Sequence, residues 1–179
     1  MPSPAPSRRR RGSLVAPVSR PEPMLDELYR DILLDHYRNP RHRGDLDGRA
    51  THSAQGTNPL CGDELTVEVT VEDGRIVDVA FAGKGCSISQ ASASMMTVYL
   101  EDRSAAEAPA AAATFQRMML KGEPPPEEFG DIEALAGVAK FPVRIKCALL
   151  GWKTLEQALA AGGETVARAT SDERSHIDV

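Results

Sequence analysis

The sequence has few aromatic residues, only three cysteines and no long apolar run. Aromatic residues make up 4% of the 179 residues, so the core must consist mainly of aliphatic and alanine side chains. No stretch of 18 apolar residues occurs, which argues against a transmembrane helix. An odd cysteine count without a Cys-x-x-Cys pair argues against a secreted disulfide scaffold. We therefore expect a cytoplasmic protein whose thiols are free, catalytic or metal-bound.

Charge is distributed unevenly along the chain. Residues 1–23 contain five arginines, six prolines and one acidic residue, whereas the remainder has 16 basic against 25 acidic residues. A segment of that composition cannot build a core, so we expect a disordered basic tail. The run Arg8–Arg11 could contact nucleic acid, but the acidic remainder would repel phosphate. We therefore expect neither a nucleic-acid partner nor a membrane partner.

The apolar pattern predicts one folded domain at residues 24–162, followed by a flexible polar tail at 163–179. Helical spacing over 24–38 ends at Asn39 because the residue before a proline avoids the α region. A short edge strand is expected at 51–57. Alternating apolar residues on both sides of a Glu-Asp-Gly turn predict an antiparallel hairpin at 64–82.

The second half of the chain is predicted to be helical. Proline fits the first turn of a helix, which places a helix start at Pro142. The order of helix, hairpin and helices indicates an α+β fold, in which a layer of helices packs on a small antiparallel sheet. The expected helices cover residues 86–101, 104–121, 129–139 and 142–162.

The three cysteines fall at the ends of predicted elements, where functional sites are often built. Cys61 lies in the loop before the hairpin, Cys86 at a helix start and Cys147 in the first turns of the last helix. Gly62 permits a tight bend, so Cys61 and Asp63 can reach one ion from one loop. Three thiolates and one carboxylate form a tetrahedral donor set that suits zinc. The same soft ligands also suit iron–sulfur species.

Local charge favours reactive thiols near two of these positions. A helix N-terminus favours the thiolate form of Cys86, and Lys84 lies beside it in the sequence. Arg144 lies three residues before Cys147, so the two share a helix face.

Other interpretations of the cysteines stay open at the level of spacing. The intervals of 25 and 61 residues match no short zinc-finger pattern, and free cysteines are often simply buried. Asp63 alone is typical of a turn. The glycines around Lys84 lack the spacing of a phosphate-binding loop. The four histidines show no ligand spacing, so we expect them to be surface or hydrogen-bonded structural residues.

Three segments that contain the cysteines resemble the cysteine motifs of the iron–sulfur assembly U-type proteins. These segments are Asn58–Asp63, Gly83–Ser92 and Phe141–Cys147, and Leu28–Pro40 is similar to the start of the family domain. The resemblance covers roughly residues 24–160. It implies the SufE/IscU-like fold, a three-stranded antiparallel sheet flanked by helices. The tail at 1–23 has no counterpart in the family.

Two features resemble the SufU branch rather than the scaffold branch of that family. Lys146 stands where the scaffolds usually have a histidine, and the Pro-rich segment at 123–126 lengthens the region before the third cysteine. The resemblance implies a zinc-dependent sulfurtransferase that takes persulfide sulfur from a SufS-like cysteine desulfurase and supplies a downstream SUF scaffold complex. The alternative is a scaffold that assembles a [2Fe–2S] cluster on the same cysteines.

The resemblance also implies roles for individual residues. Cys61 would accept the sulfur, and Arg144 would help to open the site to the partner. A carboxylate ligand is unusual in closed structural zinc sites, which disfavours a purely structural zinc domain. The implied zinc ligands are Cys61, Asp63, Cys86 and Cys147.

Overall fold

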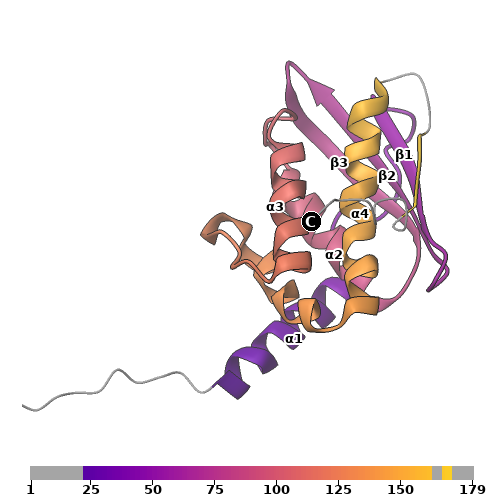
Figure 1. The fold of residues 1–179 in the computed structure, drawn as a ribbon. Helices are drawn as coiled ribbons and strands as arrows, with labels where there is room; N and C mark the ends of the chain where they lie inside the picture. The colour runs from indigo at the N-terminus through magenta and orange to yellow at the C-terminus, as the bar shows by residue number, and fades with distance from the viewer. Residues whose placement is uncertain (1–21, 163–166, 171–179) are drawn as a thin grey trace, which may run out of the picture.

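The computed structural model describes residues 22–162 and 167–170. Most of the two predicted tails, at 1–23 and 163–179, therefore lies outside the described residues. None of the helices in the described part combines the length and the apolar character that a membrane span needs. Figure 1 shows the elements, which in chain order are α1 (Glu22–Arg38), β1 (His52–Asn58), β2 (Asp63–Glu72), β3 (Arg75–Lys84), α2 (Ser87–Leu100), α3 (Ala108–Lys121), the 3₁₀ segment η1 (Glu127–Lys140), α4 (Pro142–Ala161) and β4 (Ala167–Thr170).

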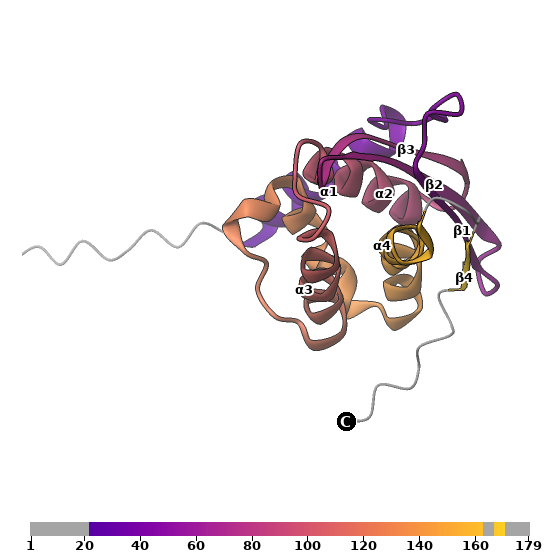
Figure 2. The same ribbon diagram turned by 90° about the horizontal axis from the view of Figure 1, so that it is seen from above.

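The first three strands form the antiparallel sheet that the alternating pattern predicts. The central strand β2 pairs with β1 on one side and with β3 on the other. The chain turns between β2 and β3 through Asp73 and Gly74, whose φ angles of 48° and 77° are both positive, as a two-residue type I′ hairpin turn requires. Helices α2 and α4 cover one face of this sheet (Figure 2). The α+β class and the three-stranded antiparallel sheet are confirmed.

A fourth strand corrects the prediction for part of the C-terminal tail. Ala167–Thr170 (β4) lies parallel to β1, with Ala54 opposite Ala167, so the strand order is β3-β2-β1-β4. β1 is therefore an inner strand and not the predicted edge strand. β4 has only four residues, Ala-Arg-Ala-Thr, and no large apolar residue that would predict a strand. Their pairing depends on main-chain N–H and C=O groups of β1, which would otherwise form an open edge.

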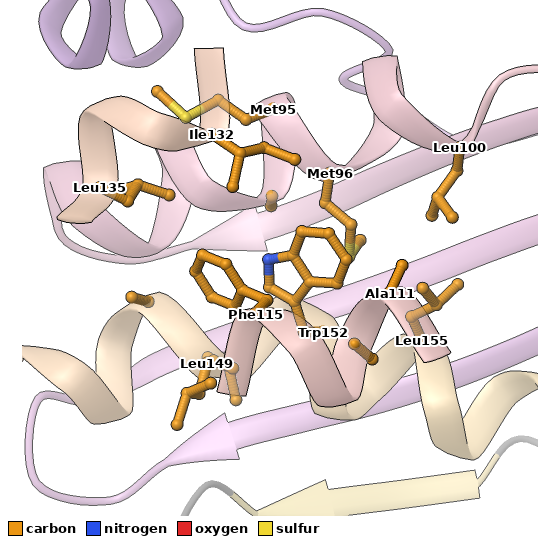
Figure 3. Close-up of a cluster of buried hydrophobic side chains, with 14 of the residues drawn as sticks. Met95, Met96, Leu100, Ala111, Phe115, Ile132, Leu135, Leu149, Trp152 and Leu155 are labelled. Carbon is orange, nitrogen blue, oxygen red and sulfur yellow. The ribbon is translucent and has the colours of Figure 1, made fainter. Parts of the chain in front are cut away.

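Trp152 of α4 lies at the centre of the core. It is 1% exposed and stacks on Phe115 of α3, with 4.7 Å between the ring centroids. Figure 3 shows that Met96 of α2 and Leu155 of α4 lie close to this pair. The surrounding buried residues are mostly alanine, leucine and methionine. The core is thus aliphatic around a few aromatic rings, as the composition predicts.

A glycine lets α4 pack closely on β1. A Cβ at Gly56 would lie 1.9 Å from Oγ1 of Thr154, a distance at which one of the two elements would have to move. The close approach brings the first turns of α4, which carry Cys147, beside the loop that follows β1.

His36 joins α1, α2 and η1. It is 2% exposed, its Nδ1 lies 2.8 Å from Oγ of Ser94, and its Nε2 lies 3.0 Å from Oδ2 of Asp131. The Ser94 oxygen also accepts the backbone N–H of Arg41. His36 is therefore a hydrogen-bonded structural histidine, as predicted, and it ties together helical segments that are distant in sequence.

Candidate metal centre

The loop between β1 and β2 presents Cys61 to solvent and buries Asp63. The backbone oxygen of Asn58 accepts the N–H groups of Cys61 and Gly62, at 3.3 and 2.8 Å. Gly62 has a φ of 69°, so the tight bend predicted at this glycine is present. Cys61 is exposed, whereas Asp63, the first residue of β2, is 1% exposed. One short loop therefore offers an accessible thiol and a buried carboxylate.

Cys86 forms the N-cap of α2, directly before the first helical residue. Its sulfur accepts the backbone N–H of Ser89 at 3.5 Å. Its own backbone N–H donates to Oδ1 of Asp63 at 3.0 Å, and its sulfur lies 3.6 Å from Oδ2 of the same carboxylate. A Cβ at Gly85 would lie 3.1 Å from this carboxylate and 2.3 Å from the Ser89 oxygen. The small residue thus allows the helix start to lie against Asp63.

Cys147 lies in the second turn of α4 and is fully buried. Its sulfur is 3.4 Å from that of Cys61 and 3.5 Å from Nδ2 of Asn58. Burial raises the pKa of the Cys147 thiol well above its usual range, and the neighbouring Cys61 and Cys86 thiols raise this pKa further. The protein alone therefore favours a protonated Cys147, whereas a cation bound between the sulfurs would favour its thiolate.

Three of the four predicted donor atoms lie close enough together to bind one zinc ion. One ligand atom each from Cys61, Asp63 and Cys147 lie within 4.8 Å of one another. Zinc–sulfur bonds of about 2.3 Å would separate tetrahedrally arranged sulfurs by about 3.8 Å, close to the 3.4 Å between Cys61 and Cys147. Cys86 does not belong to this group of three, but its sulfur lies 3.6 Å from Oδ2 of Asp63, which does. The four predicted ligands are therefore neighbours, from three separate parts of the chain.

Two cations were expected near the thiols, and the structure places them differently. Arg144 is exposed on the first turn of α4. The negative charge of Cys86 and a hydrogen bond to Cys147 raise the pKa of the Arg144 guanidinium above its usual value. Lys84 instead directs its Nζ to Oε2 of Glu64, 3.5 Å away on the neighbouring strand. Arg144 is therefore the cation directed at the sulfurs.

Two features of the site lie outside the roles that the sequence predicts. Asn58 is 1% exposed, and its side chain reaches the sulfur of Cys147. The feature of the sequence that could have indicated this role is a polar residue at the end of a strand, directly before Pro59. Three large apolar side chains beside the cysteines are also exposed, by 60 to 62% each. These are Leu60, Phe141 and Val143, and such exposed apolar groups beside a site are typical of a docking surface.

Comparisons with known proteins agree on one family. A family model described as "NifU-like N terminal domain" matches residues 28–166. A Streptococcus pyogenes protein named iron–sulfur cluster assembly scaffold protein IscU is 46% identical over 75% of this chain and 84% of its own length. The zinc-dependent sulfurtransferase SufU of Bacillus subtilis is 44% identical over 76% and 92%.

A solved structure has the same fold. It is described as a putative iron–sulfur cluster assembly scaffold protein for the SUF system from Fervidobacterium islandicum AW-1. It is 35% identical, covers 72% of this chain and 94% of its own, and superposes with a TM-score of 0.67.

Proposed function

Because the chain belongs to the NifU-like N-terminal domain family, we propose that it is a zinc-dependent sulfurtransferase of the SufU type. The chain is an iron–sulfur cluster assembly protein, and the proposal concerns its step in that process. It takes sulfur from the persulfide of a SufS-like cysteine desulfurase and delivers it to a downstream SUF scaffold complex. Zinc is held by Cys61, Asp63, Cys86 and Cys147.

The observation that carries the proposal is the unequal exposure of two neighbouring thiols. Cys61 is exposed, while Cys147, whose sulfur lies 3.4 Å away, is fully buried. A sulfur acceptor must be reached by the persulfide of another protein, and only the exposed thiol of this pair can be. The apolar side chains of Leu60, Phe141 and Val143 beside the two cysteines supply the kind of surface on which a partner docks.

The transfer itself is a thiol–persulfide exchange. When bound, zinc keeps the thiols deprotonated and protects them from oxidation. The Cys61 thiolate attacks the outer sulfur of the desulfurase persulfide, a new sulfur–sulfur bond forms at Cys61, and the desulfurase cysteine leaves as a thiolate. Cys61 then carries the persulfide, and no external oxidant or reductant is consumed. Arg144 lies beside the sulfurs and can offset the negative charge that gathers there.

The second candidate is a scaffold that assembles a [2Fe–2S] cluster on the same cysteines. The similarity to the Streptococcus pyogenes scaffold protein favours it. Lys146 favours the sulfurtransferase, because an ammonium group cannot ligate a metal, whereas the histidine that the scaffold branch usually carries at this position can.

Metal and sulfide analysis separates the two candidates. Untagged protein purified anaerobically without added metal should contain zinc that resists a mild chelator, with no labile sulfide and no colour. This result is expected because three of the four proposed ligands, Cys61, Asp63 and Cys147, already offer donor atoms within 4.8 Å of one another. Iron with an equal amount of labile sulfide and a brown colour would contradict the sulfurtransferase and support the scaffold.

Replacing Arg144 by alanine should preserve zinc binding and slow sulfur transfer. Arg144 is exposed, so the fold does not depend on it, but its charge lies beside the thiols. Groups around metal ligands commonly contribute about 10- to 100-fold to activity, and we expect a loss of that size in the transfer of ³⁵S from cysteine. Arg117→Ala is the matched control, because Arg117 is exposed on α3 and pairs with Glu123. An unchanged rate for Arg144→Ala would remove Arg144 from the mechanism.

A further inference from the structure

The three thiols differ in the N–H groups that they receive. Cys86 accepts the backbone N–H of Ser89, and Cys147 accepts the side-chain N–H of Asn58, each at 3.5 Å. The exposed guanidinium of Arg144 also hydrogen-bonds to Cys147. In the described part of the chain, the one hydrogen-bond contact of the Cys61 sulfur is with the sulfur of Cys147. The exposed thiol is therefore the one without an N–H donor.

Hydrogen bonds of this kind change what a sulfur can do. An N–H group directed at a thiolate stabilises its negative charge, which weakens the thiolate as a nucleophile and fixes its position. Groups that hydrogen-bond to metal ligands likewise orient these ligands and tune the site. Cys147 is held in this way, whereas the Cys61 sulfur receives no such N–H group in the described part of the chain.

The network around Asn58 determines which end of its amide faces Cys147. Oδ1 of Asn58 accepts the backbone N–H of Leu60 at 3.2 Å, so Nδ2 is the atom directed at the sulfur. The backbone oxygen of Asn58 accepts the N–H groups of Cys61 and Gly62. One buried residue thus holds the Cys61 loop through its two oxygens and Cys147 through its nitrogen.

We propose that Asn58 is the positioning residue that assigns different roles to the two neighbouring thiols, holding Cys147 as a fixed ligand and leaving Cys61 as the exchangeable one. This inference rests on the proposed function, in which Cys61 must be free to attack a persulfide. It adds a residue that acts through the ligands and does not itself bind the metal or the sulfur substrate.

Asn58→Asp tests the proposal with little change of shape. The aspartate keeps an oxygen that can accept the Leu60 N–H but replaces the donor facing Cys147 by a second acceptor. Asn39→Asp is the matched control, because Asn39 also precedes a proline and its side chain is exposed beside Asp35. Asn58→Ser, which adds no charge, provides a second variant should Asn58→Asp fail to fold.

Two measurements on the full chain do not depend on sulfur transfer. In the zinc-loaded wild type, iodoacetamide should modify Cys61 about tenfold or more faster than Cys147, as followed by mass spectrometry, and this preference should shrink about tenfold in Asn58→Asp. In the Co²⁺-loaded protein, the sulfur-to-cobalt charge-transfer band should move to longer wavelength in Asn58→Asp. The band should move because loss of the hydrogen bond raises the energy of the sulfur lone pair. The control variant Asn39→Asp should leave both the iodoacetamide preference and the band position unchanged.

The outcomes separate this inference from the proposed function. If the wild type prefers Cys61 and the Asn58 variants keep both the preference and the band position, the role of Asn58 is overturned and the proposed function stands. If the wild-type protein shows no preference for Cys61, the proposed acceptor is wrong and the inference fails with it.

Discussion

Replacing Cys61 by alanine should reduce sulfur transfer from a cysteine desulfurase to background and leave the fold intact. Transfer should stop because the other cysteines are less accessible, Cys147 being fully buried and Cys86 lying against Asp63. The fold should persist because Cys61 is exposed and its loop is held by backbone hydrogen bonds to Asn58. Exposed substitutions usually change the free energy of unfolding by less than about 0.5 kcal/mol. Labelling of the chain with ³⁵S-cysteine and thermal unfolding of the metal-free protein measure the two effects.

Cys147→Ala is the control that separates chemistry from packing. It removes a fully buried side chain and leaves Nδ2 of Asn58 without its sulfur partner, so we expect the metal-free protein to lose about 1–3 kcal/mol of stability. Persistent ³⁵S on the Cys61→Ala protein would show that Cys86 or Cys147 accepts the sulfur. That result would contradict the role of the exposed thiol as the sulfur acceptor.

The sequence allowed prediction of the parts of the site that are local in the chain. Cys61 and Asp63 are separated by one glycine, so their shared loop follows from the Cys-Gly-Asp motif. Cys86 follows the segment Gly83-Lys84-Gly85 and precedes a helical apolar pattern. The structure shows that it forms the N-cap of that helix. The element order was predictable for the same reason, since each helix and strand has its own apolar period.

The remaining features depend on how distant segments pack. Cys61 and Cys147 are 86 positions apart, and their contact follows from the packing of α4 on β1 at Gly56. The amide orientation of Asn58 depends on this same packing. The pairing of β4 with β1 depends on main-chain groups, which a sequence pattern does not reveal. The spacing of the cysteines was therefore also compatible with three buried free cysteines. The prediction that they share one metal ion came from the family resemblance.

Asp63→Asn should release zinc while keeping the local fold. The amide oxygen can still accept the backbone N–H of Cys86, which Oδ1 accepts at 3.0 Å in the native protein, but the negative charge that attracts the cation is lost. Changes to residues around metal ligands alone cost about 10- to 100-fold in affinity, so removal of a charged ligand should cost at least about 100-fold. Competition with a chelator of known zinc affinity measures this loss.

Two further variants show whether the effect belongs to the Asp63 carboxylate. Glu64→Gln removes an adjacent, exposed carboxylate that pairs with Lys84, and it should bind zinc as the native protein does. Asp63→Ala should lose zinc and also destabilise the metal-free protein by about 1–3 kcal/mol, because the backbone N–H of Cys86 would lose its partner. Native zinc retention by Asp63→Asn would exclude the carboxylate as a ligand. The site would then be held by its thiols, and the buried Asp63 would serve only to anchor the start of α2.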